Sequence, residues 1–482
     1  MSSSIGSTTA VSSVADDVRQ YKERHLHAPA GKAPALGGGA RADGGARRRG
    51  AEPDKLSLLC LRVMAKHFAA RPILHALPER QVPVLTALLD LDLDIEIAAA
   101  TVYDENFWRR KALGERWKSF EIAEHGLTWK QLYFERKLEQ LLEEFRPDGG
   151  GGAARSAFDV ESKHTALLEE LEAESGPGAA PAAARGHAKR AAPATEAAIL
   201  AHLRAGKDYV FQLNVKQLPS HIDLFVLFQH LPNLARLELS YGVRGIGMRY
   251  ERSLFGIKMS DAASLARSIQ QTSVLTTLAL PNNLIDDDLL RMLMSGLVSN
   301  CTITALDLSH NKITNHGARL LAKLLGPKSV LASLNLSDNA LHAEAGRYLG
   351  RALRRNNSLL ELNLRLNRLT DDGGAMLLEG LQGNASLTLL NLSCNSLGPH
   401  SGNALAALFE QGGSAISALD LSCNELADPQ LQAFSKALGG AKQGCPLLSL
   451  DVRKNLAQES VVDHLMAIVK RAEMHARRTD DL

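Results

Sequence analysis

Residues 303–313 read ITALDLSHNKI, and the pattern leucine-x-x-leucine-x-leucine-x-x-asparagine-x-leucine, with other apolar residues at some leucine places, occurs seven times in residues 275–457. Successive copies are spaced by 28, 28, 28, 28, 29 and 31 residues. A fixed period in this range that carries this phrase is the signature of leucine-rich repeats. The copies are LTTLALPNNLI (275–285), ITALDLSHNKI (303–313), LASLNLSDNAL (331–341), LLELNLRLNRL (359–369), LTLLNLSCNSL (387–397), ISALDLSCNEL (416–426) and LLSLDVRKNLA (447–457).

Each copy predicts one strand and one helix. Apolar residues at the fourth and sixth places, such as Leu306 and Leu308, alternate with polar ones, which is the period of a half-buried strand. Leucines four residues apart then predict a helix, and Gly317 and Gly373 stand where we expect that helix to pack closest. Because one unit cannot bury its leucines alone, the units should stack into an open horseshoe with parallel strands inside and helices outside. The predicted fold class is therefore α/β, a leucine-rich repeat solenoid of the ribonuclease-inhibitor type with about nine repeats.

An asparagine occupies the ninth place of every copy, where the strand must turn. Its side-chain amide can bond backbone groups that the turn leaves unpaired, and stacking the repeats should align these amides in a ladder. We therefore predict a structural asparagine ladder. It consists of Asn283, Asn311, Asn339, Asn367, Asn395, Asn424 and Asn455.

The chain divides into five predicted segments. Residues 1–55 are rich in Ser, Ala, Gly and Arg without apolar periodicity, and residues 148–193 are rich in Gly, Ala and Pro, so we predict a disordered tail and a flexible linker. Amphipathic patterns predict a small all-α, F-box-like domain over 56–147. We place the repeat domain at residues 194–457, where the first two units are irregular. For residues 458–482 we predict a capping helix and a tail.

The second repeat carries an insertion. This repeat starts at Leu234, and the next copy of the pattern follows 41 residues later instead of 28. The extra residues, within GVRGIGMRYERSLFG (242–256), fall between a strand and its helix, which places them at the rim of the horseshoe. Met248, Tyr250 and Phe255 are our first candidates for a specific protein contact, and a loop packed on itself is the alternative.

All three tryptophans, Trp108, Trp117 and Trp129, lie in the predicted helical domain. Such a cluster is more often the core of a small domain than a ligand site. Thr128 and Gln131 form a predicted capping box at the start of the last helix of that domain.

Composition and motifs argue against several function classes. The formal charge of +2 does not supply the concentrated Lys and Arg that phosphate binding needs. The sequence contains no GxxxxGK loop, no HExxH and no paired CxxC motif, and it has neither a signal peptide nor a run of 18 apolar residues. We expect no catalytic residue, no cofactor, no metal, no small-molecule substrate, no nucleic acid and no membrane span.

Five scattered cysteines indicate a reducing compartment rather than a disulfide framework. Cys394 and Cys423 share the eighth place of adjacent repeats, so their Cα atoms should lie about 5 Å apart, within disulfide reach. We expect two free thiols there.

The concave side of the sheet remains as a candidate functional surface. The second, third, fifth, seventh and eighth places should face it, and its fifth-place column is polar and mildly acidic. A solvated sheet face needs no ligand, but solenoids usually serve as docking surfaces for proteins. Our candidate contacts are Asp307, Asn335, Asn363, Arg365, Leu366 and Arg453.

Residues 77–108, LPERQVPVLTALLDLDLDIEIAAATVYDENFW, resemble an F-box, with a Leu-Pro-Glu start, spaced leucines and a closing tryptophan. An F-box followed by leucine-rich repeats would be similar to the substrate receptor of a cullin-type ubiquitin ligase, which is the alternative function. A GTPase-activating protein on this fold would need a loop arginine, and Arg244 or Arg249 could be named without anything that sets them apart.

A second resemblance covers nearly all of residues 56–475. The segments FWRRKALGERW and WKQLYFERKLEQLLEEF, the rim phrase LSYGVRGIGMRYERSLFGIKMSDAASLA and the late phrase KNLAQES resemble the T-complex-associated testis-expressed protein 1 family, which is dynein regulatory complex subunit 5. The resemblance implies a non-enzymatic scaffold subunit of the nexin-dynein regulatory complex, in the axoneme of motile cilia and flagella. The implied partners are other subunits of that complex, associated with the doublet microtubules. The family supplies no catalytic residues.

Overall fold

The computed structural model describes residues 56–115, 117–145, 195–218, 222–242, 254–440 and 445–480. The described residues, from Leu56 onward, belong to one compact unit. The predicted disordered tail (1–55) and flexible linker (148–193) lie outside the described residues. The division into five segments stays a prediction.

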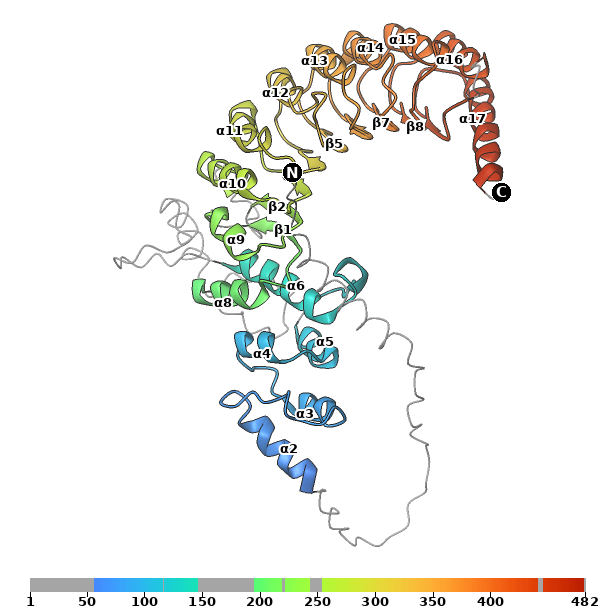
Figure 1. The fold of residues 1–482 in the computed structure, drawn as a ribbon. Helices are drawn as coiled ribbons and strands as arrows, with labels where there is room; N and C mark the ends of the chain where they lie inside the picture. Colours follow the sequence, from blue (N-terminus) through green and yellow to red (C-terminus); the bar gives the residue numbers. More distant parts are fainter. Residues whose placement is uncertain are drawn as a thin grey trace, which may run out of the picture. The chain divides into compact units, whose positions relative to one another are not determined.

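Within the described residues, nine strands form one parallel sheet whose strand order follows the sequence (Figure 1). Residues at the same place of successive repeats are partners, so that Leu278 pairs with Leu306 and Leu306 with Leu334. The sheet alternates with helices, which confirms the predicted fold class. The strands are β1 (Gln212–Leu218), β2 (Arg236–Tyr241), β3 (Thr277–Ala279), β4 (Ala305–Asp307), β5 (Ser333–Asn335), β6 (Glu361–Asn363), β7 (Leu389–Asn391), β8 (Ala418–Asp420) and β9 (Ser449–Asp451).

The helices of the array lie on the outer side of the arc that the strands line (Figure 1). Several of their first turns are capped by side chains, as where Asp286 accepts hydrogen bonds from the N–H groups of Asp288 (3.2 Å) and Leu289 (3.0 Å). The last helix, α17, takes the place of the predicted closing helix. The helices are α8 (Glu196–Gly206), α9 (Leu224–His230), α10 (Met259–Gln271), α11 (Asp287–Leu297), α12 (Asn315–Leu321), α13 (Ala343–Leu353), α14 (Thr370–Gly380), α15 (Pro399–Glu410), α16 (Asp428–Gly440) and α17 (Glu459–Asp480).

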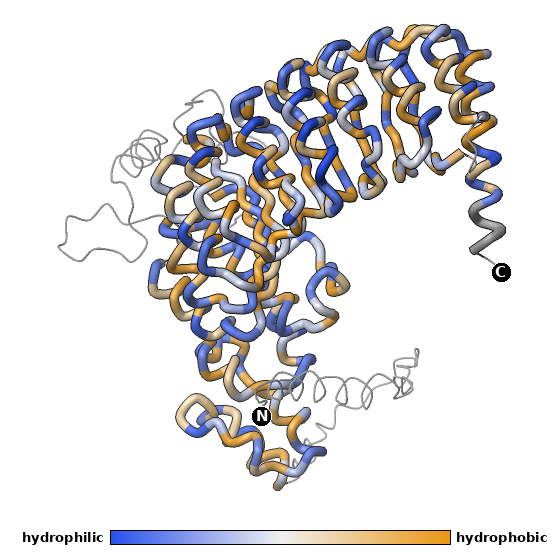
Figure 2. Tube along the Cα trace, turned by 45° about the horizontal axis from the view of Figure 1, so that its top comes forward, coloured by the Kyte–Doolittle hydropathy of each residue, from blue (hydrophilic) through white to orange (hydrophobic). Residues whose placement is uncertain are grey.

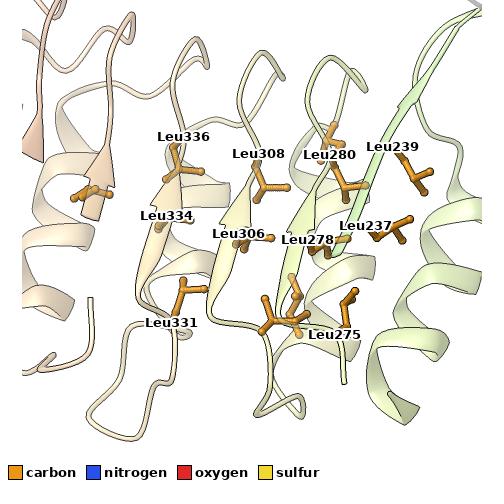
Figure 3. Close-up of a cluster of buried hydrophobic side chains, with 14 of the residues drawn as sticks. Leu237, Leu239, Leu275, Leu278, Leu280, Leu306, Leu308, Leu331, Leu334 and Leu336 are labelled. Atoms are coloured by element: carbon orange, nitrogen blue, oxygen red, sulfur yellow. The ribbon is translucent and has the colours of Figure 1, made fainter. Parts of the chain in front are cut away.

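The core of the array is a set of leucine rows that run from repeat to repeat. In Figure 3, Leu278, Leu306 and Leu334 lie side by side, and each is at most 2% exposed. Burying one leucine side chain contributes about 2 kcal/mol, so the rows couple neighbouring repeats strongly. Figure 2 shows hydrophobic and hydrophilic residues along each helix of the array, as expected for helices with one buried face. The helix leucines predicted from the four-residue spacing are all buried: Leu321, Leu325, Leu349, Leu353, Leu377 and Leu381.

Two glycines let the helices approach closely. A Cβ atom on Gly317 would lie 2.4 Å from Ile313 Cγ2, and one on Gly373 would lie 2.6 Å from Ala343 Cα. Neither position can hold a side chain without a shift of its neighbours. The predicted close packing at both glycines is confirmed.

The N-terminal helices pack around the tryptophan cluster. Trp108 is fully buried, its Nε1–H donates to Val102 O at 2.9 Å, and its ring centroid lies 5.3 Å from that of Phe134. Trp117 and Trp129 are half-buried against the same core. These helices are α2 (Leu56–Lys66), α3 (Val82–Leu88), α4 (Ile95–Thr101), α5 (Glu105–Gly114), the short 3-10 helix η1 (Ile122–Glu124) and α6 (Trp129–Glu144).

The predicted capping box of α6 is half formed. Thr128 Oγ1 accepts a hydrogen bond from the N–H of Gln131 at 3.3 Å, as expected. The reciprocal bond is replaced, because Thr128 N donates to His125 O at 3.3 Å, and Gln131 Nε2 donates to Glu135 Oε1 at 2.9 Å. Glu135 lies one helical turn further on, and its carboxylate also bonds the first strand of the sheet.

Helix α6 covers the edge of β1, the first strand, where no strand of the described residues accepts the outward N–H groups. Four helical residues rise about 6 Å and two strand residues about 6.6 Å, so a glutamate at every fourth helix position matches alternate N–H groups. We call Glu135, Glu139 and Glu143 the glutamate ladder. Glu135 Oε1 accepts from Phe211 N (2.9 Å) and Gln212 N (3.2 Å), Glu139 Oε1 from Asn214 N (2.7 Å), and Glu143 Oε1 from Lys216 N (3.2 Å).

The middle of the ladder is buried. Glu139 is 6% exposed, and burial raises its pKa to about 7, although the bond from Asn214 N and the nearby Arg136 lower it. Glu135 is fully buried, and its Oε2 lies 2.5 Å from His125 Nδ1. The carboxylates therefore form part of the interior where the helices meet the sheet.

Lys130 makes a second polar connection between the N-terminal helices and the array. Its Nζ donates to Ala99 O (2.7 Å) and Val102 O (3.3 Å) at the end of α4, and to Tyr209 Oη (3.0 Å) before β1. A cation is favoured at the carbonyl end of a helix. Burial nevertheless lowers the pKa of Lys130 to about 8.

Candidate protein-binding surface

The asparagine ladder ties each repeat to the one before it. Asn339 Nδ2 donates to Leu308 O (3.0 Å) in the preceding repeat and to Leu336 O (3.1 Å) in its own, while its Oδ1 accepts from Ile313 N (3.0 Å). The six asparagines from Asn283 to Asn424 are at most 9% exposed. They hold the turns from inside. The other members donate in the same way to the preceding repeat: Asn283, Asn311, Asn367, Asn395, Asn424 and Asn455.

A second set of amides and carboxylates runs along the fifth place. Asp307 Oδ1 accepts from Ser309 N at 2.8 Å, and its Oδ2 accepts from Asn335 Nδ2 at 2.9 Å. Asn335 Oδ1 and Asn363 Oδ1 likewise accept from the backbone N–H two residues further on, at 3.1 Å each. These three candidate contacts therefore close the strand ends as Asx turns. Much of their hydrogen-bonding capacity is used within the chain, and their contact with a partner stays a prediction.

The eighth place of the seven regular repeats has a left-handed backbone, with φ between 51° and 58°. Asparagine and aspartate tolerate this conformation, whereas other side chains cost roughly 1–2 kcal/mol. Leu366 adopts it and is still 41% exposed. A strained, exposed apolar side chain is a reason to suspect a binding contact. The eighth-place residues are Asn282, His310, Asp338, Leu366, Cys394, Cys423 and Lys454.

Other exposed leucines occur in the repeats around Leu366. Leu360 is 46% exposed and Leu389 is 38% exposed, at the second and third places of adjacent repeats. The prediction from sequence missed both leucines. The signal was present in the sequence, since most other repeats have Thr, Ser or Ala at these places. We call Leu360, Arg365, Leu366 and Leu389, which are exposed residues of the repeats that begin at Leu359 and Leu387, the concave patch. Arg365 is exposed beside Leu366 and supplies its positive charge.

Arg453 lies in the last repeat. Its Nε donates to both carboxylate oxygens of Asp451, at 2.9 and 3.0 Å, and its Nη2 donates to Oδ2. The side-chain bond from Arg453 holds the pKa of Asp451 below its usual range. The guanidinium is exposed, so this pair offers a mixed-charge contact near the C-terminal end of the array.

The rim insertion is described only at its ends, since residues 243–253 lie outside the described residues, and with them Met248, Tyr250, Arg244 and Arg249. Phe255 is half-buried, and a Cβ atom on Gly242 would lie 3.1 Å from its Cδ1. Gly256 N donates to Tyr241 O at 3.4 Å, so the two ends of the insertion meet. Phe255 thus packs at the base of the insertion.

Over the ranges that the structure describes, no group of three or more His, Cys, Asp or Glu side chains could hold a metal ion. In the same part of the chain, no helix is long and apolar enough to cross a membrane.

The comparisons with known proteins agree with the repeat phrase and with the family resemblance. The Leucine Rich repeat family model matches residues 299–322 and 355–378. Dynein regulatory complex subunit 5 of Chlamydomonas reinhardtii is 36% identical over 235 residues, which are 48% of this chain and 49% of that relative. The matched half of the chain is similar in sequence to dynein regulatory complex subunit 5. The human subunit 5 is 33% identical over 249 residues, which are 51% of this chain and 46% of that relative. The chain thus spans about half the length of these relatives.

Among solved structures, an internalin from Listeria monocytogenes is 14% identical and covers 59% of this chain and 82% of that chain, with a TM-score of 0.35. A TM-score of this size adds nothing to the argument from the repeats.

Proposed function

We propose that the chain is a non-enzymatic scaffold subunit of the nexin-dynein regulatory complex, located in the axoneme of a cilium or flagellum. The observation that carries this proposal is the 36% identity with dynein regulatory complex subunit 5 of Chlamydomonas reinhardtii over 235 residues. The proposed partners are other subunits of that complex, held at the doublet microtubules of the axonemal cytoskeleton. The chain would help to regulate dynein-driven motility by fixing these neighbours at set distances.

The repeat array suits this role because its sheet is continuous and its repeats are coupled through buried leucines and amides. The concave patch offers apolar area for one neighbour. Helix α2 offers a second apolar surface, because Leu56, Leu59 and Val63 are 76%, 45% and 58% exposed. Two modest contacts on one rigid body bind far more tightly together than either does alone.

The test uses flagellated cells that lack their own subunit 5 and express the full chain with a tag. We expect the tagged chain along the axoneme after the membrane has been removed with detergent. Leu366→Asp should lower the axoneme-bound fraction about tenfold, since the loss of about 1.4 kcal/mol of binding free energy has that effect. Arg351→Glu, on the exposed outer side of α13, is the matched control and should leave the fraction unchanged. A wild-type chain that is fully extracted with the detergent would contradict the proposal.

The ubiquitin-ligase receptor remains the second candidate, favoured by one observation within residues 77–108. Val84 and Leu88 on α3 are 41% and 37% exposed, so this segment presents apolar area that an adaptor could cover. A pull-down with a purified Skp1-like adaptor separates the two functions. Stoichiometric binding that is lost in the double variant Val84→Asp, Leu88→Asp would favour the receptor.

A further inference from the structure

Cys394 and Cys423 lie next to each other at the ends of β7 and β8. The two strands are in register, with Asn391 opposite Asp420, and the pairing continues beyond them because Cys394 N donates to Ser422 O at 3.0 Å. Neighbouring strands lie about 4.8 Å apart, which is within the Cα separation that a disulfide spans. Both cysteines have the same left-handed backbone, with φ of 55° and 56°, so their side chains leave the chain in the same direction.

The two thiols differ in their surroundings. Cys423 is exposed and Cys394 is half-buried. Burial raises the pKa of the Cys394 thiol, the Cys423 thiol raises it further, and the guanidinium of Arg365 lowers it. Because the Cys423 side chain acts on the Cys394 thiol across the paired strands, the two thiols lie close to each other. Cys423 is the thiol that a reagent in solution meets first.

Positive charge flanks the pair on both sides. Arg365 acts on Cys394 from the preceding repeat, and Arg453 lies close enough to Cys423 to be influenced by its charge. Disulfide exchange proceeds through a thiolate. At Cys394, Arg365 favours that form, whereas burial, the Cys423 thiol and Asp420 oppose it. The two arginines also attract a reagent that carries carboxylates, such as glutathione disulfide.

We propose that Cys394 and Cys423 form a redox-active dithiol on the concave side, which low-molecular-weight disulfides convert into an intramolecular disulfide. The Cys423 thiolate attacks one sulfur of glutathione disulfide, forms a mixed disulfide and releases one glutathione thiolate. The Cys394 thiolate then attacks Cys423 Sγ, forms the Cys394–Cys423 bond and releases the second glutathione. The protein loses two electrons, glutathione disulfide gains them, and the two thiol protons end on the two glutathione molecules.

Such a bond would join two repeats across the sheet, within the column of eighth-place residues that also contains Leu366. The surface next to the concave patch would then change with the redox state of the compartment. The inference stands on the cysteine geometry and does not depend on the identity of the chain's partners.

The experiment uses the full chain, reduced and freed of reductant, and glutathione disulfide as the probe. We expect loss of two of the five thiols, and a peptide that links Cys394 to Cys423 in the mass spectrum. Cys394→Ser should stop at the mixed disulfide and keep one glutathione on Cys423. Cys423→Ser should lose the intramolecular bond and react at least tenfold more slowly at Cys394.

Cys301→Ser is the matched control, because Cys301 is exposed like Cys423 and lies in a different repeat. It should still lose the two thiols of the pair. Circular dichroism of each variant shows whether the array is folded. Retention of all five thiols in the wild type, a stable glutathione adduct on wild-type Cys423, or a disulfide to any other cysteine would overturn the proposal.

Discussion

Glu139→Gln is the sharpest test of how the N-terminal helices join the repeat array. The amide Oε1 can keep the hydrogen bond from Asn214 N, which is 2.7 Å long in the wild type, while the variant carries no charge at any pH. The substitution therefore isolates the effect of burying an ionised carboxylate, with almost no change in shape.

The magnitude follows from the pKa of Glu139, which burial raises from 4.5 to about 7. A carboxyl whose pKa is higher in the folded than in the unfolded state contributes stability that is complete below the unfolded pKa. That contribution is lost as the pH rises through the folded pKa. Each pH unit between the two values removes about 1.4 kcal/mol, so the wild type should lose up to about 3 kcal/mol between pH 4.5 and pH 7 from this group. The glutamine variant should not lose it.

The assay is urea unfolding at pH 5 and pH 8, followed by the fluorescence of the three tryptophans, which lie in the segment from α5 to the first residue of α6. We expect wild type and Glu139→Gln to be similar at pH 5, and the variant to be more stable by about 2–3 kcal/mol at pH 8. Glu143→Gln is the control for removing one negative charge from the same helix. Equal pH dependence of wild type and Glu139→Gln would refute the reasoning.

Three further predictions concern the array. Asn339→Ala should lower the free energy of unfolding by about 3 kcal/mol, because it strands buried backbone groups in two repeats, and a loss below about 1 kcal/mol in urea unfolding would contradict the ladder's role. Leu366→Asn should raise it by about 0.5–1 kcal/mol by relieving the left-handed strain, seen as a higher Tm, while it weakens axonemal incorporation; a lower Tm would count against the strain argument. Replacing residues 243–253 with a short glycine linker should leave the circular dichroism of the array unchanged, because Gly256 N already bonds Tyr241 O, and should weaken incorporation. Normal incorporation of the folded deletion would exclude the insertion as a contact.

The repeat array was predictable because its information is local and periodic. Leu306 and Leu308 show in one phrase which side of the strand is buried, and the fixed spacing of the phrase places each leucine beside its counterpart in the next repeat. The same logic predicted the close packing at Gly317 and Gly373. Seven copies of one pattern can be aligned with each other, and that alignment shows which residues of neighbouring repeats lie side by side.

The glutamate ladder was not predictable in this way. Glu135 and Phe211 are 76 residues apart, and the predicted linker lies between them, so no local spacing connects the two segments. Glutamates four residues apart on a helix are ordinarily a solvated face, and only the edge of β1 gives them another use. The hydrogen bonds of the fifth-place residues could not be predicted for a related reason. Asp307 and Asn335 look like free polar groups until the turn shows which N–H each oxygen accepts.

The glutamate ladder has a consequence for biosynthesis. Because α6 is synthesised before β1, the three carboxylates of the glutamate ladder stay in contact with water until β1 has been synthesised. Once β1 has packed on α6, the other edge of β1 can pair with β2. Each later repeat can then pack on the repeat synthesised before it, which is already folded and lies farther from the ribosome. We therefore expect folding to advance from the first strand to the last in the direction of translation.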